Sequence, residues 1–162
     1  MEIQFRNMTQ NDVEEIINVH KKSIYGLCKD FYSDGQMETW TGMFNHKIFN
    51  DGMKDINNIG IVAFNENKVV GYGFINIKDK EVKGMYLIPE VTKKGIGQLI
   101  LKKLEASAQE HKLDELVLNS TLNAVAFYEK CGYKRIRDEL FELTENCKLS
   151  CVHMAKKLRG VN

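Results

Sequence analysis

The chain lacks most of the features that would place it in a specialised class of protein. Its 162 residues contain a single proline, Pro89, and no proline-, glycine- or serine-rich tract that would mark a linker or a disordered segment. No apolar run approaches the roughly 20 residues needed to span a bilayer. The formal net charge at pH 7 is +1, which gives no overall attraction to nucleic acid or to a membrane surface. These absences favour one globular domain over residues 1–162 that binds neither.

Cysteine is present, but its spacing is not that of a zinc site or of a disulfide framework. The four cysteines are Cys28, Cys131, Cys147 and Cys151, and no two of them form a Cys-x-x-Cys pair. We therefore expect reduced thiols and no bound metal. The segment 1–6 also lacks the basic start and apolar run of a secretory signal peptide. The sequence thus predicts a cytoplasmic protein.

Hydrophobic periodicity predicts a mixed α/β domain. Strands are predicted at 2–8, 59–64, 68–77, 81–88, 116–119, 133–143 and 148–157, and helices near 9–20 and at 34–49, 96–112 and 123–131. The resulting order, β-α-α-β-β-β-α-β-α-β-β, gives a mixed central sheet flanked by helices. The helices 96–112 and 123–131 are predicted to connect parallel strands. In the helix 96–112, the pattern places Leu99 on the buried face and Glu105 outward.

The most informative segment is the turn Thr92-Lys93-Lys94-Gly95-Ile96-Gly97-Gln98, which lies between a strand-like run and a helical run. The first N–H groups of a helix have no partner within it, and the helix dipole favours an anion beside them. Two glycines without a Cβ allow a ligand to approach the backbone closely. Two lysines add positive charge. This arrangement predicts a phosphate-binding turn.

Two other phosphate-binding motifs do not fit this turn. A dinucleotide-binding fingerprint requires a third glycine where this chain has Ile100. A P-loop requires Gly-Lys followed by Ser or Thr, whereas Gly97 is followed by Gln98 and Leu99. Both motifs are excluded by the residues themselves.

A second segment, Asn123-Ala124-Val125-Ala126-Phe127-Tyr128-Glu129-Lys130-Cys131-Gly132-Tyr133, extends the comparison. Together with the turn it resembles the GNAT family of acyl-coenzyme A N-acyltransferases, whose signature is Gln or Arg, two free positions, Gly, one free position, and Gly or Ala. Here Thr92 stands where Gln or Arg is usual. The run Met85-Tyr86-Leu87-Ile88-Pro89-Glu90 looks like the strand and proline that precede the signature. The resemblance is close over 81–133, extends loosely over the whole chain, and through 23–40 points to a bacterial branch of predicted N-acetyltransferases.

The resemblance implies that acetyl-coenzyme A is the cosubstrate and that its acetyl group passes directly to a primary amine. In the family, the pantetheine arm lies between two strands that splay apart and pairs with free backbone groups of one of them. The positions that match the family's cofactor contacts are Met85, Tyr86, Leu87, Thr92, Lys93, Lys94, Gly95, Ile96, Gly97, Gln98, Asn123 and Tyr128. Asn123 is also expected to cap the helix that follows it.

Acetyl transfer requires a neutral amine and a stabilised leaving thiolate. By resemblance, Tyr128 is the proton donor to the thiolate, since a phenol with a pKa near 10 is protonated at pH 7; alternatively it only packs in the core. Glu81 lies eleven residues before Thr92, the spacing of the catalytic carboxylate in histone-type members, and on an extended strand it would share a face with Lys83 and Met85.

Other side chains are weaker candidates for the proton acceptor or for a covalent step. Histidines 20, 46, 111 and 153 are further proton acceptors; His20 is expected in the core and His111 beside a helix C-terminus. Cys131 precedes Gly132 at a helix end, where a small buried thiol is more typical of packing than of an acyl intermediate.

The acceptor is less defined. The region 23–49 is expected to shape its pocket and is rich in aromatic and acidic residues, which fits a small amine or a peptide terminus. A homodimer is possible. Two functions compete with acetyl transfer: a non-catalytic acyl-coenzyme A sensor, and a module associated with nucleic acid, which the near-neutral charge argues against.

Overall fold

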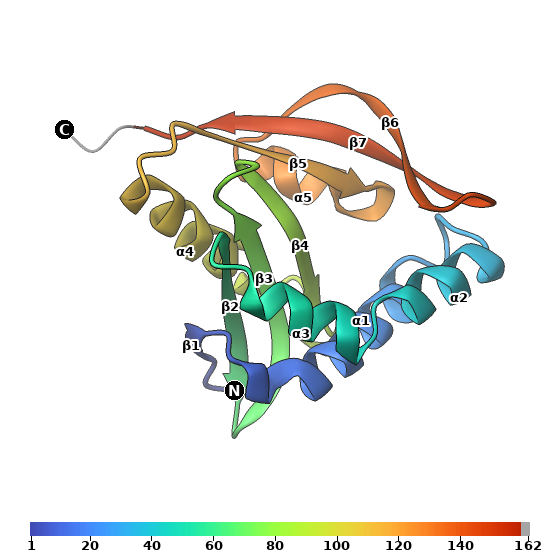
Figure 1. Ribbon diagram of the computed structural model, residues 1–162, viewed down its shortest axis with the longest axis horizontal. Helices are drawn as coiled ribbons and strands as arrows, with labels where there is room; N and C mark the ends of the chain where they lie inside the picture. Colours follow the sequence, from blue (N-terminus) through green and yellow to red (C-terminus); the bar gives the residue numbers. More distant parts are fainter. Residues whose placement is uncertain (160–162) are drawn as a thin grey trace.

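The computed structural model describes residues 1–159, which contain a sheet of seven strands in the order β1-β2-β3-β4-β5-β7-β6 (Figure 1). The strands are β1 (Gln4–Asn7), β2 (Asn58–Asn65), β3 (Lys68–Asn76), β4 (Glu81–Leu87), β5 (Glu115–Thr121), β6 (Lys134–Thr144) and β7 (Cys147–Lys157). The first four are antiparallel neighbours, β4 and β5 are parallel, and β7 is antiparallel to both β5 and β6. The predicted mixed sheet is confirmed.

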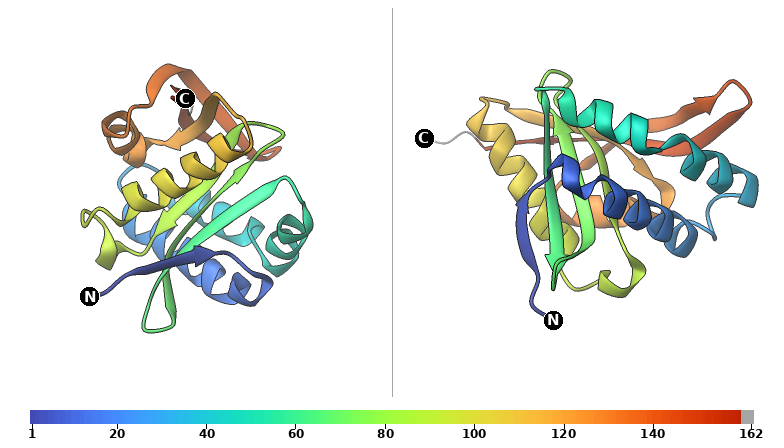
Figure 2. Two further views of the ribbon diagram at one scale, coloured as in Figure 1. Left: turned by 90° about the vertical axis from the view of Figure 1, so that its left-hand side faces the viewer. Right: turned by 60° about the horizontal axis from the view of Figure 1, so that its bottom comes forward.

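Helices cover both faces of this sheet (Figure 2). On one side lie α1 (Val13–Leu27), α2 (Asp34–Met43) and α3 (His46–Lys54), and on the other lie α4 (Ile96–Glu110) and α5 (Val125–Lys130). Short 3-10 turns cover Gln10–Asp12, Pro89–Val91 and Leu122–Ala124. As predicted, α4 connects parallel strands, and α5 connects β5 to β6, which run parallel with β7 between them. In the described part of the chain, no helix has the length and apolar character needed to cross a membrane.

The sequence predicted one helical region over 34–49, and the structure divides it into α2 and α3. The Asn45 side chain accepts a hydrogen bond from the Ile48 N–H at 3.1 Å and so begins a new helix after Phe44. An asparagine side chain competes with the helical ladder and is favoured at a helix start. Ser33 begins α2 in the same way, with its hydroxyl accepting from the Gln36 N–H at 3.1 Å. The chain therefore has one more helix than predicted.

The strands β4 and β5 separate soon after they meet. They pair only at Glu81 with Val117 and at Val82 with Leu118. The next residue, Lys83, is an extra residue in β4, because Val82 and Gly84 face two consecutive residues of β3. Such a bulge bends its strand and increases its twist. The two strands therefore splay apart beyond Val82, as the family resemblance predicted.

The same bulge corrects the predicted orientation of β4. Glu81, Lys83 and Met85 were expected on one face, but Met85 packs among the core residues under α4. Glu81 and Lys83 form an ion pair and line a cavity together with Tyr86 on the opposite face. An extra residue reverses the alternation of side chains along a strand. The sequence contains no signal for this reversal.

The buried face of α4 also differs from the prediction. Leu99 is 46% exposed, whereas Leu101 is buried. Glu105 was expected to point outward, but it is buried, and both of its carboxylate oxygens lie within 2.8 Å of the Lys156 Nζ on β7. Because the charge of each side chain is compensated by the other, Glu105 can occupy the interior.

Candidate active site

The predicted phosphate-binding turn has the expected backbone geometry. Gly95 precedes α4 with φ 81° and ψ 0°, a left-handed conformation that glycine adopts without strain. The first hydrogen bond of the helix runs from the Leu99 N–H to the Gly95 carbonyl at 3.1 Å. The N–H groups of Ile96, Gly97 and Gln98 therefore precede the helical ladder. Exposed Lys93, itself left-handed with φ 60°, stands at the entrance of the turn, and exposed Lys94 follows it.

The two glycines of the turn have different roles. A Cβ on Gly95 would meet no atom within 4 Å, so the space beside it is open. A Cβ on Gly97 would lie 3.3 Å from the side chains of Leu87 and Phe127. Gly97 therefore allows the start of α4 to pack closely against β4 and α5, a reason that the motif alone did not suggest. The Thr92 hydroxyl donates to the Pro89 carbonyl at 2.8 Å and stabilises the preceding 3-10 turn.

Beyond the splay, β4 presents free backbone toward β5. Met85, Tyr86 and Leu87 pair with β3 on one side, while the pairing with β5 ends at Val82. The Met85 and Leu87 side chains pack under α4, and the Tyr86 ring lies on the opposite face. The segment predicted to bind a pantetheine arm thus borders the gap between the two strands.

Tyr128 lies on α5, against the same face of the sheet as α4. It is 6% exposed, and its ring lies edge-on to Phe127 and Tyr133, with centroids 5.2 and 5.8 Å away. Burial raises the pKa of Tyr128 above its ordinary value, so the phenol is protonated throughout the physiological range. The protonated phenol is consistent with a role as proton donor, and the buried aromatic packing is consistent with a structural role in the core.

Asn123 does not cap its helix as predicted. It lies within the 3-10 turn Leu122–Ala124, and α5 begins after Ala124 without a side-chain cap. The Asn123 Oδ1 instead accepts from the Cys28 Sγ at 3.4 Å. Burial raises the pKa of Cys28 to about 12, so this thiol stays protonated and can donate. This contact links the residue after α1 to the turn before α5, two segments that are distant in sequence.

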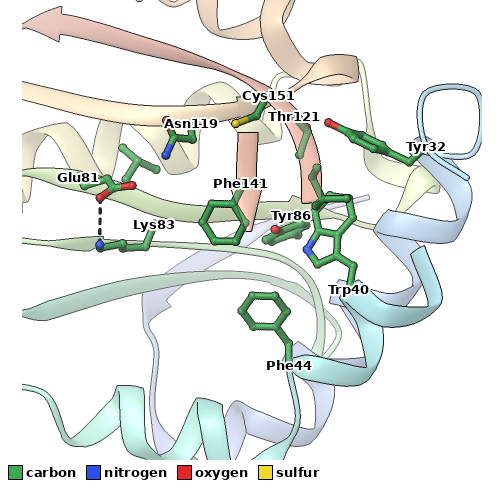
Figure 3. A pocket seen from close by; sticks show the side chains of 12 residues that line it. Tyr32, Trp40, Phe44, Glu81, Lys83, Tyr86, Asn119, Thr121, Phe141 and Cys151 are labelled. Carbon is green, nitrogen blue, oxygen red and sulfur yellow. Dashed lines mark ion pairs between the residues drawn. The ribbon is translucent and has the colours of Figure 1, made fainter. Parts of the chain in front are cut away.

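On the face opposite α4, a cavity of about 80 Å³ lies at the splay (Figure 3). It is lined by Tyr32, Trp40, Phe44, Glu81, Val82, Lys83, Tyr86, Asn119, Thr121, Phe141, Leu149 and Cys151. Five of these twelve residues are aromatic. The Tyr32 hydroxyl donates to the Ser150 carbonyl at 2.6 Å and accepts from the Leu122 N–H at 3.0 Å, which fixes this ring between β7 and the 3-10 turn before α5.

The charged groups of the cavity are Glu81 and Lys83. The Lys83 Nζ lies 3.0 Å from a Glu81 carboxylate oxygen and 2.9 Å from one of Asp79 (Figure 3 marks the former contact). Burial disfavours the charge on Lys83, but the two carboxylates outweigh it and raise the pKa of Lys83. Glu81 therefore lies at the cavity, and the positive charge of Lys83 partly compensates its negative charge.

The four histidines lie outside the cavity lining. His20 is buried in the core as predicted, with its Nδ1 3.1 Å from the Tyr72 hydroxyl, and burial lowers its pKa to about 3. His111 stands at the C-terminus of α4 as predicted, and its Nδ1 lies 2.8 Å from the Ser107 carbonyl. His46 is exposed at the start of α3. His153 contacts the cavity residue Asn119, with 2.8 Å between its Nδ1 and the asparagine Oδ1.

Sequence reasoning missed the part of the cavity wall that comes from β5, β6 and β7. Asn119 and Thr121 share one face of β5, and Phe141, Leu149 and Cys151 come from the last hairpin. Alternation along these strands shows which residues share a face. It does not show that β7 inserts between β5 and β6, and that order brings the hairpin to the cavity. Among residues 1–159, no group of three or more histidine, cysteine, aspartate or glutamate side chains is arranged to hold a metal ion.

Comparison with known proteins agrees with this geometry. A family described as "Acetyltransferase (GNAT) domain" matches residues 28–158. The spermidine N(1)-acetyltransferase of Thermoplasma acidophilum is 29% identical over 146 residues, which cover 83% of this chain and 89% of that protein. A GCN5-related N-acetyltransferase from Rhodopseudomonas palustris superposes with a TM-score of 0.88 at 21% identity, covering 98% and 97% of the two chains. The PaiA N-acetyltransferase of Thermoplasma acidophilum, in complex with coenzyme A, gives 0.81 at 24%, covering 97% and 99%.

Proposed function

The chain belongs to the GNAT acetyltransferase family, and we propose that it moves the acetyl group of acetyl-coenzyme A to a primary amine of a small cationic acceptor. One observation carries the proposal. The gap between β4 and β5 has an anion-binding turn and a buried tyrosine on one face of the sheet, and a cavity with a carboxylate on the other. A thioester lying in this gap would be accessible from both faces.

The cosubstrate supplies an activated acetyl group, and the chain supplies its binding groups. The pyrophosphate is proposed to bind the N–H groups of residues 95–98, with Lys93 and Lys94 adding positive charge. The free backbone of 85–87 is proposed to pair with the pantetheine arm as an added strand would. Because the Thr92 hydroxyl donates its hydrogen bond to the Pro89 carbonyl, we assign Thr92 a role in shaping the turn and no direct contact with phosphate.

Tyr128 is proposed to protonate the leaving thiolate. A free thiol has a pKa near 8.5, so the sulfur of coenzyme A can leave as a thiolate and benefits from a proton donor. Tyr128 lies on the cofactor side and keeps its proton at neutral pH. No covalent acyl-enzyme is required. Cys131 ends α5, and burial raises the pKa of its thiol, which makes it a poor nucleophile.

Glu81 is proposed to accept the proton of the acceptor ammonium, directly or through water. It lines the cavity, and Lys83 holds its carboxylate in place. For this transfer the arriving ammonium would have to lie beside the Glu81 carboxylate and replace Lys83 as part of its ion pairing.

The acceptor is proposed to be a primary amine at the end of a short alkyl chain, as in polyamines. Aromatic rings and a carboxylate together favour an ammonium group. A cavity of this volume, about 80 Å³, has room for the aminoalkyl end of a substrate. The polyamine class is further supported by the name of the spermidine-acetylating relative.

The direct test is the release of free coenzyme A from acetyl-coenzyme A in the presence of polyamines, single amines, amino acids, aminoglycosides and peptides. We expect thiol release with linear polyamines and little with α-amino acids, whose carboxylate would meet Glu81. Glu81→Gln should lower kcat with the best amine and shift its pH profile. Asp79→Asn is the matched control, because Asp79 also pairs with Lys83 but does not line the cavity.

Two outcomes would contradict the proposal. Saturable binding of acetyl-coenzyme A without thiol release for any acceptor would favour a non-catalytic sensor. Full activity of Glu81→Gln with an unchanged pH profile would remove Glu81 as the base and leave acetyl transfer itself intact.

A further inference from the structure

The outer edge of β6 is a long strand edge that is exposed among the described residues. β6 is the strand at one end of the sheet. One of its edges pairs with β7, and the outer edge has no strand beside it among the described residues. Three large apolar side chains on this strand are exposed: Ile136 by 54%, Leu140 by 63% and Phe141 by 46%. A long, exposed, partly apolar edge is a template for another strand. The edge of β1, by contrast, is only four residues long.

The charges of β6 are sorted along its length. Its first half carries Lys134, Arg135 and Arg137, and its second half carries Asp138, Glu139 and Glu142. Charged residues on an edge strand can prevent its pairing with other chains, but this does not require positive and negative residues to lie in separate halves of the strand. A sorted strand is complementary to itself when it is turned around, because its basic half then faces an acidic half.

We propose that a second copy of this chain pairs with β6 across a two-fold axis. Two identical edge strands related by such an axis run antiparallel and form an isologous interface, in which each contact occurs twice. The basic half of each β6 would then oppose the acidic half of the other. This inference is independent of acetyl transfer, since none of the charged β6 side chains belongs to the proposed catalytic machinery.

The axis that best matches the charges passes through Asp138. Arg137 of each copy then faces Glu139 of the other, in the regular part of β6 between the register shifts at 135/137 and 142/144. In the single chain the Arg137 Nε already pairs with the Glu139 Oε1 at 2.6 Å, with both side chains at least one-third exposed. Exposed pairs of this kind contribute little to stability, so exchanging partners costs little. The only unfavourable contact is between the two Asp138 carboxylates at the axis.

The interface also adjoins the acceptor cavity. Phe141 belongs to the exposed edge strand and to the cavity lining. A second copy would therefore lie along the outer wall of the cavity and restrict the motion of that wall.

The test uses two charge reversals, each of which should disrupt self-association. In Arg137→Glu, both inter-chain contacts become Glu with Glu; in Glu139→Arg, both become Arg with Arg. When the two variants are mixed, each contact is again Glu with Arg. By sedimentation we expect a concentration-dependent dimer for the full-length wild type, a dissociation constant raised by roughly tenfold or more for each variant alone, and recovery on mixing. Native mass spectrometry distinguishes the mixed dimer by mass. Lys102→Glu, on exposed α4 surface, is the control for charge alone.

A wild-type chain that stays monomeric at every concentration, or variants that dimerise as tightly as the wild type, would overturn the proposal. So would two folded variants that show no preference for each other on mixing. Asp138→Asn removes the like-charge contact at the axis and should tighten the dimer. If it weakens the dimer instead, the proposed register is wrong.

Discussion

The two faces of the sheet at the splay are built in different ways. The proposed cofactor face consists of the β4 edge, the turn at the start of α4, and α5, all within 81–133. The proposed acceptor face draws on the loop after α1, on α2, and on four strands, and its lining residues extend from Tyr32 to Cys151. The first face would recognise its ligand mainly through backbone groups in a fixed conformation, and the second through side chains. This division would allow the acceptor face to change through substitutions that leave the cofactor face intact.

The largest expected effect tests whether the cofactor face holds the proton donor. Tyr128→Phe keeps the ring and its packing but removes the hydroxyl. We expect kcat to fall by about 10² to 10⁴, equivalent to about 2.7 to 5.5 kcal/mol of barrier, with little change in acetyl-coenzyme A affinity. Steady-state kinetics with the best amine would measure it.

Tyr133→Phe is the matched control for this change. Tyr133 packs against Tyr128, and its buried hydroxyl has no hydrogen-bond partner among the described residues. Its removal should leave kcat unchanged. Equal kcat values for the wild type and Tyr128→Phe would make Tyr128 a packing residue.

The next effect is a pH-dependent loss of stability that arises in the helical layer over the proposed acceptor face. His20 lies among aromatic rings under α1, α2 and α3, and its pKa is lowered to about 3 by burial. The unfolded chain binds a proton at His20 below about pH 6.5, which the folded chain does not. The free energy of unfolding should therefore fall by up to about 1.4 kcal/mol per pH unit as the pH drops below 6.5 toward 3.

Urea titrations at several pH values between neutral and mildly acidic would measure this slope. His20→Gln should flatten it, whereas His46→Gln, at an exposed position, should not. The rings that touch His20 include Tyr72 and Tyr86, whose raised pKa values keep them from titrating in this range. An unchanged slope in His20→Gln would assign the acid sensitivity to other groups, such as the Arg6–Asp12 pair.

A smaller effect concerns the phosphate turn alone. Lys94→Glu reverses an exposed charge beside the proposed pyrophosphate site. We expect acetyl-coenzyme A to bind about tenfold more weakly at low salt, equivalent to about 1.4 kcal/mol, and the difference to shrink as salt screens it. Calorimetric titration measures the affinity, and Lys103→Glu, further along α4, is the control. Equal losses of acetyl-coenzyme A affinity in both variants would indicate a general electrostatic attraction of the ligand to the protein, with no specific pyrophosphate site at the turn.

The smallest effect concerns the acceptor wall. Phe141→Leu keeps an apolar side chain but removes a ring that could face an ammonium group. The amine KM should rise a few-fold, since an exposed cation–π contact contributes about 0.5 to 1 kcal/mol, while the acetyl-coenzyme A KM stays the same. A change in the cosubstrate KM instead would mean that the two faces are not independent.

The success of the sequence predictions follows the same division. The strands, the turn at Gly95 and the crossover helix were predictable because each is specified by neighbouring residues through periodicity, glycine conformation and helix-end chemistry. The cavity was not, because its wall depends on β7 inserting between β5 and β6. Two local errors have physical causes as well. Asn45 begins a new helix inside a region whose sequence pattern indicates a single helix. Glu105 is buried because Lys156, which is distant in the sequence, forms an ion pair with it.

The extra residue at Lys83 shifts by one position the alternation of side chains between the two faces of β4. Odd-numbered side chains lie on the cavity face before it and under α4 after it, so one strand contributes side chains to both faces of the sheet. Deleting or adding one residue between Glu81 and Tyr86 would leave the composition nearly intact and exchange the two assignments. Substitutions at these positions should therefore be tolerated more readily than any change of length.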